Sequence, residues 1–107
     1  MNRIESMLGM ATKAGRTVSG LYLVKEAVCS GKARLVIVAK DAEANTRRTL
    51  ENKCRSYEVP IRIYADKDTI GIFTGKEYRS CAAVTDAGFA RNLLKLIDEE
   101  QGEEYRQ

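Results

Sequence analysis

The feature that most constrains this chain is an unbroken apolar run, Leu35-Val36-Ile37-Val38-Ala39, between Arg34 and Lys40. Its short length and its β-branched residues are typical of a β-strand. A strand with one face in water alternates apolar and polar residues, and this run does not alternate. It therefore predicts a strand over residues 34–40 that other elements cover on both faces.

Two helical patterns precede this strand. Asn2 and Glu5 form a capping-box pattern at the start of the first helix. The second helix begins after Gly20, with Ser19 as its predicted cap. Its buried face follows helical spacing and contains Leu21, Val24 and Val28. A short extended link is predicted between the two helices.

The alternation of helix and strand continues in the second half of the chain. Asn45 is the predicted cap of a third helix, whose apolar face contains Leu50, Cys54 and Tyr57. Further strands are predicted over residues 61–64 and 81–85. Asp66 and Asp86 follow these strands, and each is placed to cap a helix.

This alternation predicts an α/β fold, in the form of a three-layer α-β-α sandwich with a small mixed sheet. A chain of 107 residues can bury a core of that size without disulfides or metals. We expect a single domain over residues 1–97. Residues 98–107 contain five acidic residues and one arginine, and we expect a frayed acidic tail there.

Composition argues against most catalytic and metal-binding classes. The chain has no histidine, and Cys29, Cys54 and Cys81 are too widely spaced for a zinc site, so we expect reduced core residues. The glycine patterns of dinucleotide and P-loop sites and the GxSxG motif are absent. Asp41 and Asp86 fit a turn and a helix cap better than a catalytic role. We expect neither an enzyme nor a cofactor.

Charge and hydropathy limit the location and the partners. We expect a cytoplasmic protein without a membrane partner, since no apolar run approaches a membrane span and the N-terminus lacks the apolar core of a signal peptide. The formal charge is +3, but residues 1–97 carry 17 basic and 10 acidic residues, a net charge of +7. A basic body favours polyanionic partners.

Loops at one end of such a sheet gather together, which predicts a candidate binding edge. It would combine the helix start after Gly20 with the turn at Lys40 and the loop over residues 75–79, including Lys76, Tyr78 and Arg79. Backbone amides and basic side chains bind phosphate, and aromatic rings contact exposed bases. A solvated edge with scattered charge explains the same residues equally well.

Several motifs in order resemble the kink-turn-binding ribosomal-protein superfamily of the L7Ae and L30e type. They are Val18-Ser19-Gly20, Lys25-Glu26-Ala27-Val28, the segment from Lys32 to Ala42, Thr69-Ile70-Gly71 and Thr74-Gly75-Lys76-Glu77. The segments Leu8 to Arg16 and Val84 to Ala90 are similar to its bacterial YlxQ-type branch. The resemblance covers nearly all of residues 4–97.

The resemblance implies an α-β-α sandwich that binds folded RNA without catalysis. The helix start after the glycine would enter the major groove at the kink, and the loop before the last strand would cover unstacked nucleotides. The implied partners are structured RNA, such as ribosomal RNA or another kink-turn RNA, and the ribosome, with no DNA. The RNA-binding positions on these segments are Ser19, Gly20, Leu21, Tyr22, Leu23, Lys25, Glu26, Lys40, Asp41, Lys76, Glu77, Tyr78 and Arg79.

The helix start departs from the family pattern. Members that bind kink-turns commonly have Asn-Glu or Lys-Gln where this chain has Tyr22-Leu23, and a lysine where it has Glu26. We therefore expect weaker or altered RNA binding, in which Tyr22 stacks on bases. Two alternatives stay open at this point. One is a protein-interaction or regulatory module without base readout, and the other is the substrate-binding part of an RNA-modifying enzyme with a separate catalytic partner.

Overall fold

The four strands form a mixed sheet in the order β1-β4-β2-β3, with helices on both faces. The computed structural model describes residues 1–104. Along the chain, the elements are α1 (Arg3–Lys13), β1 (Thr17–Ser19), α2 (Leu21–Cys29), β2 (Leu35–Val38), α3 (Ala44–Tyr57), β3 (Ile61–Ile63), α4 (Lys67–Phe73), β4 (Cys81–Val84) and α5 (Ala87–Glu104).

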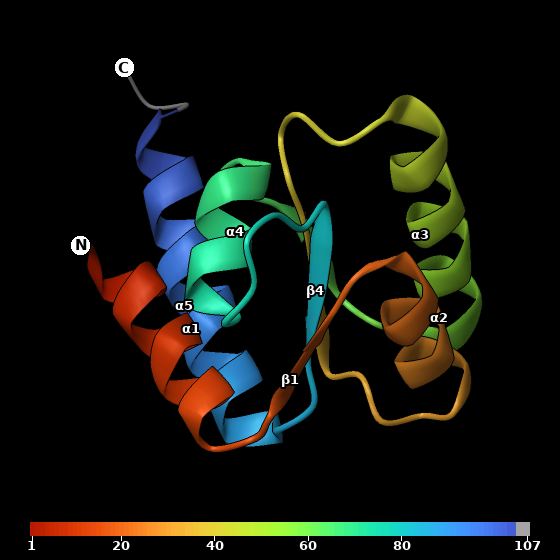
Figure 1. The fold of residues 1–107 in the computed structure, drawn as a ribbon, viewed down its shortest axis with the longest axis horizontal. Coiled ribbons are helices and arrows are strands. Elements are labelled where there is room, and N and C mark those ends of the chain that lie inside the picture. The colour runs from red at the N-terminus through yellow and green to blue at the C-terminus, as the bar shows by residue number, and fades with distance from the viewer. Residues whose placement is uncertain (105–107) are drawn as a thin grey trace.

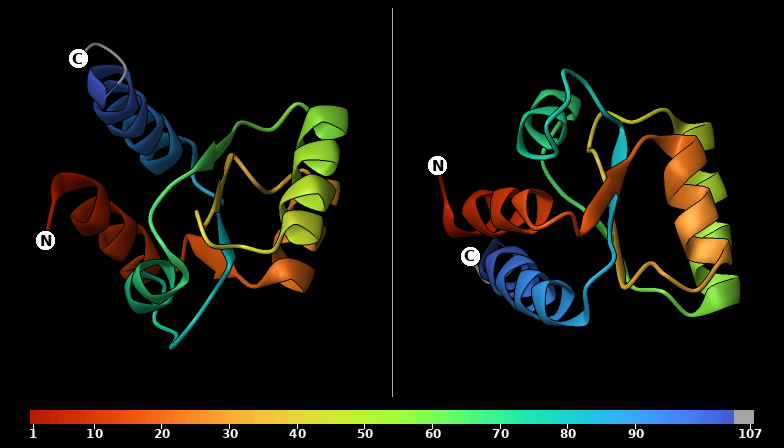
Figure 2. Two further views of the ribbon diagram at one scale, coloured as in Figure 1. Left: turned by 90° about the horizontal axis from the view of Figure 1, so that it is seen from above. Right: turned by 60° about the horizontal axis from the view of Figure 1, so that its bottom comes forward.

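The helices divide between the two faces of the sheet and make the predicted three-layer sandwich. Figures 1 and 2 show α2 and α3 on one face and α1, α4 and α5 on the other. Strand β2 pairs in parallel with β3 and antiparallel with β4, which in turn pairs antiparallel with β1. The predicted fold class and the mixed sheet are confirmed.

The central strand is covered on both faces, as its unbroken apolar run predicts. Leu35 and Ile37 pack into the core under α1, α4 and α5. Val36 and Val38 pack into the second core, under α2 and α3. All four side chains are fully buried. Because successive side chains of a strand point to opposite faces, one short segment anchors both layers.

Three of the predicted helix caps form, and two do not. Asn2 and Glu5 make the full capping box, and the carboxylates of Asp66 and Asp86 accept the amides of Thr69 and Phe89. The predicted cap at Asn45 is wrong, because α3 begins at Ala44, one residue before it. The predicted cap at Ser19 is also wrong, because Ser19 is the buried last residue of β1.

The predicted frayed tail is wrong over residues 98–104, where α5 continues as a helix to Glu104. The side chain of Asp98 accepts two hydrogen bonds from the Arg62 guanidinium, at 2.7 and 3.1 Å. One turn later, the Gln101 amide donates to the Ile63 carbonyl at 2.7 Å. These contacts with β3 bind the helix to the sheet, and composition alone does not reveal them. Residues 105–107 lie outside the described residues.

Two side chains predicted for the core lie at the surface. Cys29 follows the buried Val28 at the end of α2 and is exposed, because a helix turns by about 100° per residue. Tyr57, the last residue of α3, is 49% exposed. The other predicted core cysteines, Cys54 and Cys81, are buried thiols.

Candidate nucleic-acid interface

Four segments far apart in the sequence meet at one end of the sheet. Strands β1, β2 and β3 run in one direction and β4 runs in the other. The carboxyl ends of the first three strands therefore lie beside the amino end of β4, at the top of Figure 1. The segments gathered there are Gly20, Lys40-Asp41, Ala65-Asp66 and the loop before Ser80.

Gly20 joins the sheet to α2 in a conformation that suits glycine. Its φ is 92°, and its amide donates to the Cys81 carbonyl at 3.1 Å. No side chain caps α2, so the amides of its first turn are open to an anion. A Cβ at Gly20 would lie 3.8 Å from the Arg79 side chain, which places that guanidinium arm directly beside the helix start.

A cleft of about 300 Å³ opens between this helix start and the loop before β4. Lys67, Tyr78 and Arg79 line one part of it, and Glu43 and Thr46 line another. The cleft thus combines two cations and an exposed ring with a carboxylate and a hydroxyl. These groups can contact a phosphate, a base face and a base edge within one small site.

Hydrogen bonds to backbone groups fix the positions of the residues around the cleft. The Asp41 carboxylate accepts the amide of Lys67 at 2.9 Å, which ties the turn after β2 to α4. The amide of Arg79 donates to the Lys67 carbonyl at 3.2 Å. The Arg79 guanidinium donates to the Tyr78 carbonyl at 2.8 Å. Hydrogen bonding to Tyr78 raises the pKa of Lys67 above its ordinary value, so this lysine stays charged.

The loop over residues 75–79 rests directly on α4 at Gly71. The Lys76 amide donates to the Gly71 carbonyl at 2.7 Å. A Cβ at Gly71 would lie 2.6 Å from the Tyr78 nitrogen and 2.8 Å from the Glu77 oxygen, which leaves no room for any other residue. The absence of a side chain at Gly71 therefore allows the loop to take the path that positions Tyr78.

The predicted positions on α2 divide into exposed and covered ones. Tyr22 is 76% exposed and Leu23 is 46% exposed, and Glu26 is exposed as well. Leu21 packs partly against the core under α2 and α3, and Lys25 is half-buried. An exposed tyrosine-leucine pair thus stands next to the open amides of the helix start.

Not every predicted residue lies at the cleft. Lys40 lines a separate depression with Glu5, Asp66 and Glu100, so its charge is placed among carboxylates. Lys76 and Glu77 are exposed on the loop outside the cleft lining. Of the predicted residues, Gly20, Tyr78 and Arg79 line the cleft. Asp41 does not line it, but its carboxylate accepts the backbone amide of the lining residue Lys67.

Sequence reasoning missed four residues of the cleft: Glu43, Thr46, Lys67 and Ser80. A signal for Lys67 was present, because it directly follows the helix cap Asp66. Parallel pairing of β2 and β3 brings the start of α4 to the same sheet end as Asp41. No comparable signal marked Glu43 or Thr46, which stand at the start of a helix on the other layer.

Within residues 1–104, no group of histidine, cysteine and carboxylate side chains is arranged to hold a metal ion. The same residues include no helix with the length and apolar character needed to cross a membrane.

Comparison with known proteins decides the family. The model of the Ribosomal protein L7Ae/L30e/S12e/Gadd45 family matches residues 2–94. The chain belongs to this family. The resemblance to the L7Ae and L30e type is thereby confirmed, and with it the prediction that the chain is not an enzyme.

Relatives of this L7Ae/L30e family member share most of its length. It is 39% identical over 92 residues to the RNA-binding protein YlxQ of Bacillus subtilis, covering 86% of this chain and 92% of that protein. A solved protein of unknown function from Bacillus halodurans has a TM-score of 0.88 at 37% identity, covering 92% and 99% of the two chains. The Giardia lamblia 15.5kD RNA binding protein shares the fold, with a TM-score of 0.77 at 19% identity over 92% of each chain.

Proposed function

We propose that this chain binds structured RNA at the end of the sheet where α2 begins. The observation that carries the proposal is the cleft in which Lys67, Tyr78 and Arg79 face the uncapped start of α2. Helix amides and cations bind phosphate oxygens, and the exposed ring offers a face for an unstacked base. The named function of the Bacillus subtilis relative, RNA binding, supports the same conclusion.

The family's kink-turn mode of binding assigns a role to each part of the interface. The start of α2 from Gly20 enters the groove at the kink, where paired G and A bases are exposed. The loop with Tyr78 and Arg79 covers the nucleotides that leave the stack. A flipped base would enter the cleft, with its edge toward Glu43 and Thr46 and its phosphate toward Lys67.

The apolar pair on α2 changes how bases are read. Leu23 has no polar side-chain atom and Tyr22 has only a hydroxyl, so the pair cannot make the bidentate contacts to a base edge that an amide side chain makes. Tyr22 is exposed enough to stack on a base, and stacking tolerates any base. We therefore propose that this protein recognises the shape of a kinked or internally looped RNA with little dependence on its base sequence.

A titration distinguishes kink recognition from general RNA binding. Wild-type protein is titrated by electrophoretic mobility shift against a standard kink-turn RNA and a fully paired RNA of the same length and composition. Tighter binding to the kinked RNA is expected, and equal affinity for both would remove the kink-specific part of the proposal. Repeating the titration over a range of salt gives the number of phosphate contacts.

Charge-removing variants locate the interface. Arg79→Ala and Lys67→Ala should each weaken binding and lower the salt slope by about one contact. Arg91→Ala is the matched control, since it removes an exposed cation near the start of α5, which follows the carboxyl end of β4, whereas the cleft lies at the amino end of β4. If the control weakens binding as much as the cleft variants do, the interface lies elsewhere.

A protein-interaction module is the second candidate, and the exposed apolar pair Tyr22-Leu23 is the observation that favours it. The neighbouring Arg79 and the open helix start favour RNA instead. If the protein shows no salt-dependent binding to any structured RNA, the protein-interaction module becomes the favoured function. For RNA bound inside the cell, we expect the partner to be ribosomal RNA or another kink-turn RNA, and the location to be cytoplasmic.

A further inference from the structure

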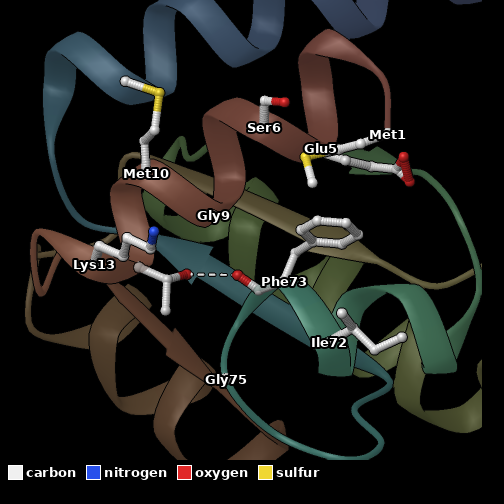
Figure 3. Close-up of a pocket in the computed structure, with 10 residues that line it drawn as sticks. Met1, Glu5, Ser6, Gly9, Met10, Lys13, Ile72, Phe73 and Gly75 are labelled. Atoms are coloured by element: carbon white, nitrogen blue, oxygen red, sulfur yellow. Dashed lines mark hydrogen bonds between the residues drawn. The ribbon is translucent and has the colours of Figure 1, made fainter.

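An apolar groove of about 470 Å³ lies between α1 and α4, in the layer opposite to α2 and α3. Figure 3 shows the Phe73 ring of α4 beside α1, with Ile72 next to it on the α4 side of the groove. Gly9 packs against the Phe73 ring. An added Cβ there would be 3.7 Å from that ring.

The groove presents large apolar side chains to water. Ile72 is 64% exposed and Met10 is 55% exposed, and both line the groove. Met1, which also lines the groove, is 89% exposed. The remaining exposed aromatic and large aliphatic side chains of the described residues belong to the RNA interface or to Tyr57 on α3. Adjacent apolar side chains on a surface mark a docking site more often than isolated ones do.

Two opposite charges are placed symmetrically about the middle of this groove. Glu5 and Lys13 both line it, and each is four residues from Gly9 along α1. A helix rises 1.5 Å per residue, so each charge lies about 6 Å along the axis from Gly9. Among the described residues, neither side chain is part of an ion pair.

This arrangement is self-complementary. In a two-fold symmetric contact, residue i of one copy meets residue j of the other, and residue j meets residue i. Two α1 helices that cross antiparallel at Gly9 would place Glu5 of each copy against Lys13 of the other. In such a contact, Met10 and Ile72 of both copies would leave water.

We propose that the groove between α1 and α4 binds a second copy of this chain in a two-fold symmetric dimer. The dimer is a weak one, because the contact centres on one helix of 11 residues and the groove beside it, which falls short of the roughly 800 Å² per partner of a standard stable interface. A dissociation constant on the order of micromolar is expected. The groove and the RNA cleft share no lining residue, so the dimer does not depend on the proposed RNA binding.

Sedimentation equilibrium of nuclease-treated wild-type protein over a concentration series tests the dimer. Ile72→Lys places a charge in the groove and should raise the dissociation constant at least about tenfold. Tyr57→Lys is the matched control, because it adds the same charge at an exposed ring on α3. Circular dichroism spectra identical to wild type show that both variants fold.

Charge exchange tests the symmetry. Glu5→Lys and Lys13→Glu, each alone, place like charges together at both contacts and should be monomeric. An equal mixture of the two variants pairs lysines with glutamates at both contacts, so it should dimerise again. The Asn2 side chain still accepts the backbone amide of residue 5 in these variants, which preserves that part of the helix cap.

Three results would overturn the proposal. Wild-type protein that stays monomeric into the millimolar range has no second copy in the groove, which is then left to a different protein. A dimer that Ile72→Lys leaves unchanged is formed by another surface. A mixture of the two charge variants that stays monomeric rejects the antiparallel crossing at Gly9.

Discussion

The ammonium nitrogen of Lys67 lies 5.1 Å from the centre of the Tyr78 ring. This contact joins the first residue of α4 to the loop before β4, and it fixes one face of the ring against the protein. Tyr78 is 53% exposed in this position, so its ring is held in place and still open to a ligand.

The ring rather than the hydroxyl of Tyr78 should determine its contribution to RNA binding. Tyr78→Ala should weaken binding to a kinked RNA by about 1–3 kcal/mol, the range for loss of one base–aromatic stack. Tyr78→Phe keeps the ring and should retain most of the affinity. Fluorescence anisotropy with a labelled RNA measures both variants. A Phe variant as weak as the Ala variant would show that the hydroxyl makes the contact.

Gly71 should tolerate no larger residue. In Gly71→Ala, the new Cβ would meet the backbone of Glu77 and Tyr78 at 2.6–2.8 Å, so the loop has to move. Overpacking of this kind costs about 1–3 kcal/mol. Urea denaturation should show that loss of stability, and RNA affinity should fall with it because Tyr78 and Arg79 lie on the displaced loop.

Gly9→Ala is the matched control for Gly71→Ala. It also adds one methyl group to a helical glycine, but its Cβ would be at an ordinary contact distance from Phe73. Alanine in a helix interior is more favourable than glycine by about 1 kcal/mol, so this variant should be as stable as wild type or more stable. Equal destabilisation by both substitutions would contradict the steric explanation.

The cysteines should differ sharply in reactivity. Cys29 is exposed, whereas Cys54 and Cys81 are buried. A thiol-specific reagent should modify one cysteine in the native protein and all three in denaturant. Modification of a second cysteine at neutral pH, at a rate above that of global unfolding, would show that one of the cores opens locally.

Burial of Cys54 predicts a loss of stability in alkali. Burial raises the pKa of its thiol from the ordinary value of 9.0 to about 11. As the pH rises above 9, the unfolded chain releases this proton before the folded chain does, so the free energy of unfolding falls. The contribution of the protonated Cys54 thiol to the free energy of unfolding is fully present below pH 9 and is lost as the pH rises toward 11. Cys54→Ala should show a shallower decline in chemical denaturation over this range.

The ion pair between Arg62 and Asp98 should stabilise the end of α5 in a pH-dependent way. Hydrogen bonding to Arg62 holds the pKa of Asp98 below its ordinary value of 3.8. The stabilisation is therefore present at neutral pH and disappears as the pH falls below 3.8. Asp98→Asn should cost at most about 1 kcal/mol at pH 7, because the pair is partly exposed. The difference between variant and wild type should narrow in acid.

The architecture follows from the sequence because local and global signals agree. The apolar run at residues 35–39 requires cover on both faces, and helical patterns supply enough cover. The incorrect predictions came where a contact from a distant segment decides the outcome. Composition made residues 98–104 an acidic tail, but Arg62 and Ile63 of β3 hold them as helix.

The location of the candidate site could be predicted from the sequence, but the set of residues that line it could not. Gly20 and the loop before β4 lie at one end of the sheet because β4 runs antiparallel to β1, which a mixed sheet allows. The separation of Lys40 from the cleft depends on which side of α4 its side chain takes, and sequence spacing does not contain that information. The same is true of Glu43 and Thr46, which reach the cleft from the other layer.

The extension of α5 has a consequence for the solubility of the protein. Strand β3 lies at the edge of the sheet, and its residues 61 and 63 turn their carbonyls away from β2. The Arg62 guanidinium donates a hydrogen bond to the Ile61 carbonyl, and the Gln101 side-chain amide donates one to the Ile63 carbonyl. An edge whose acceptors are already bound is a poor template for a strand from another molecule. The helical end of α5 thus protects this edge against aggregation.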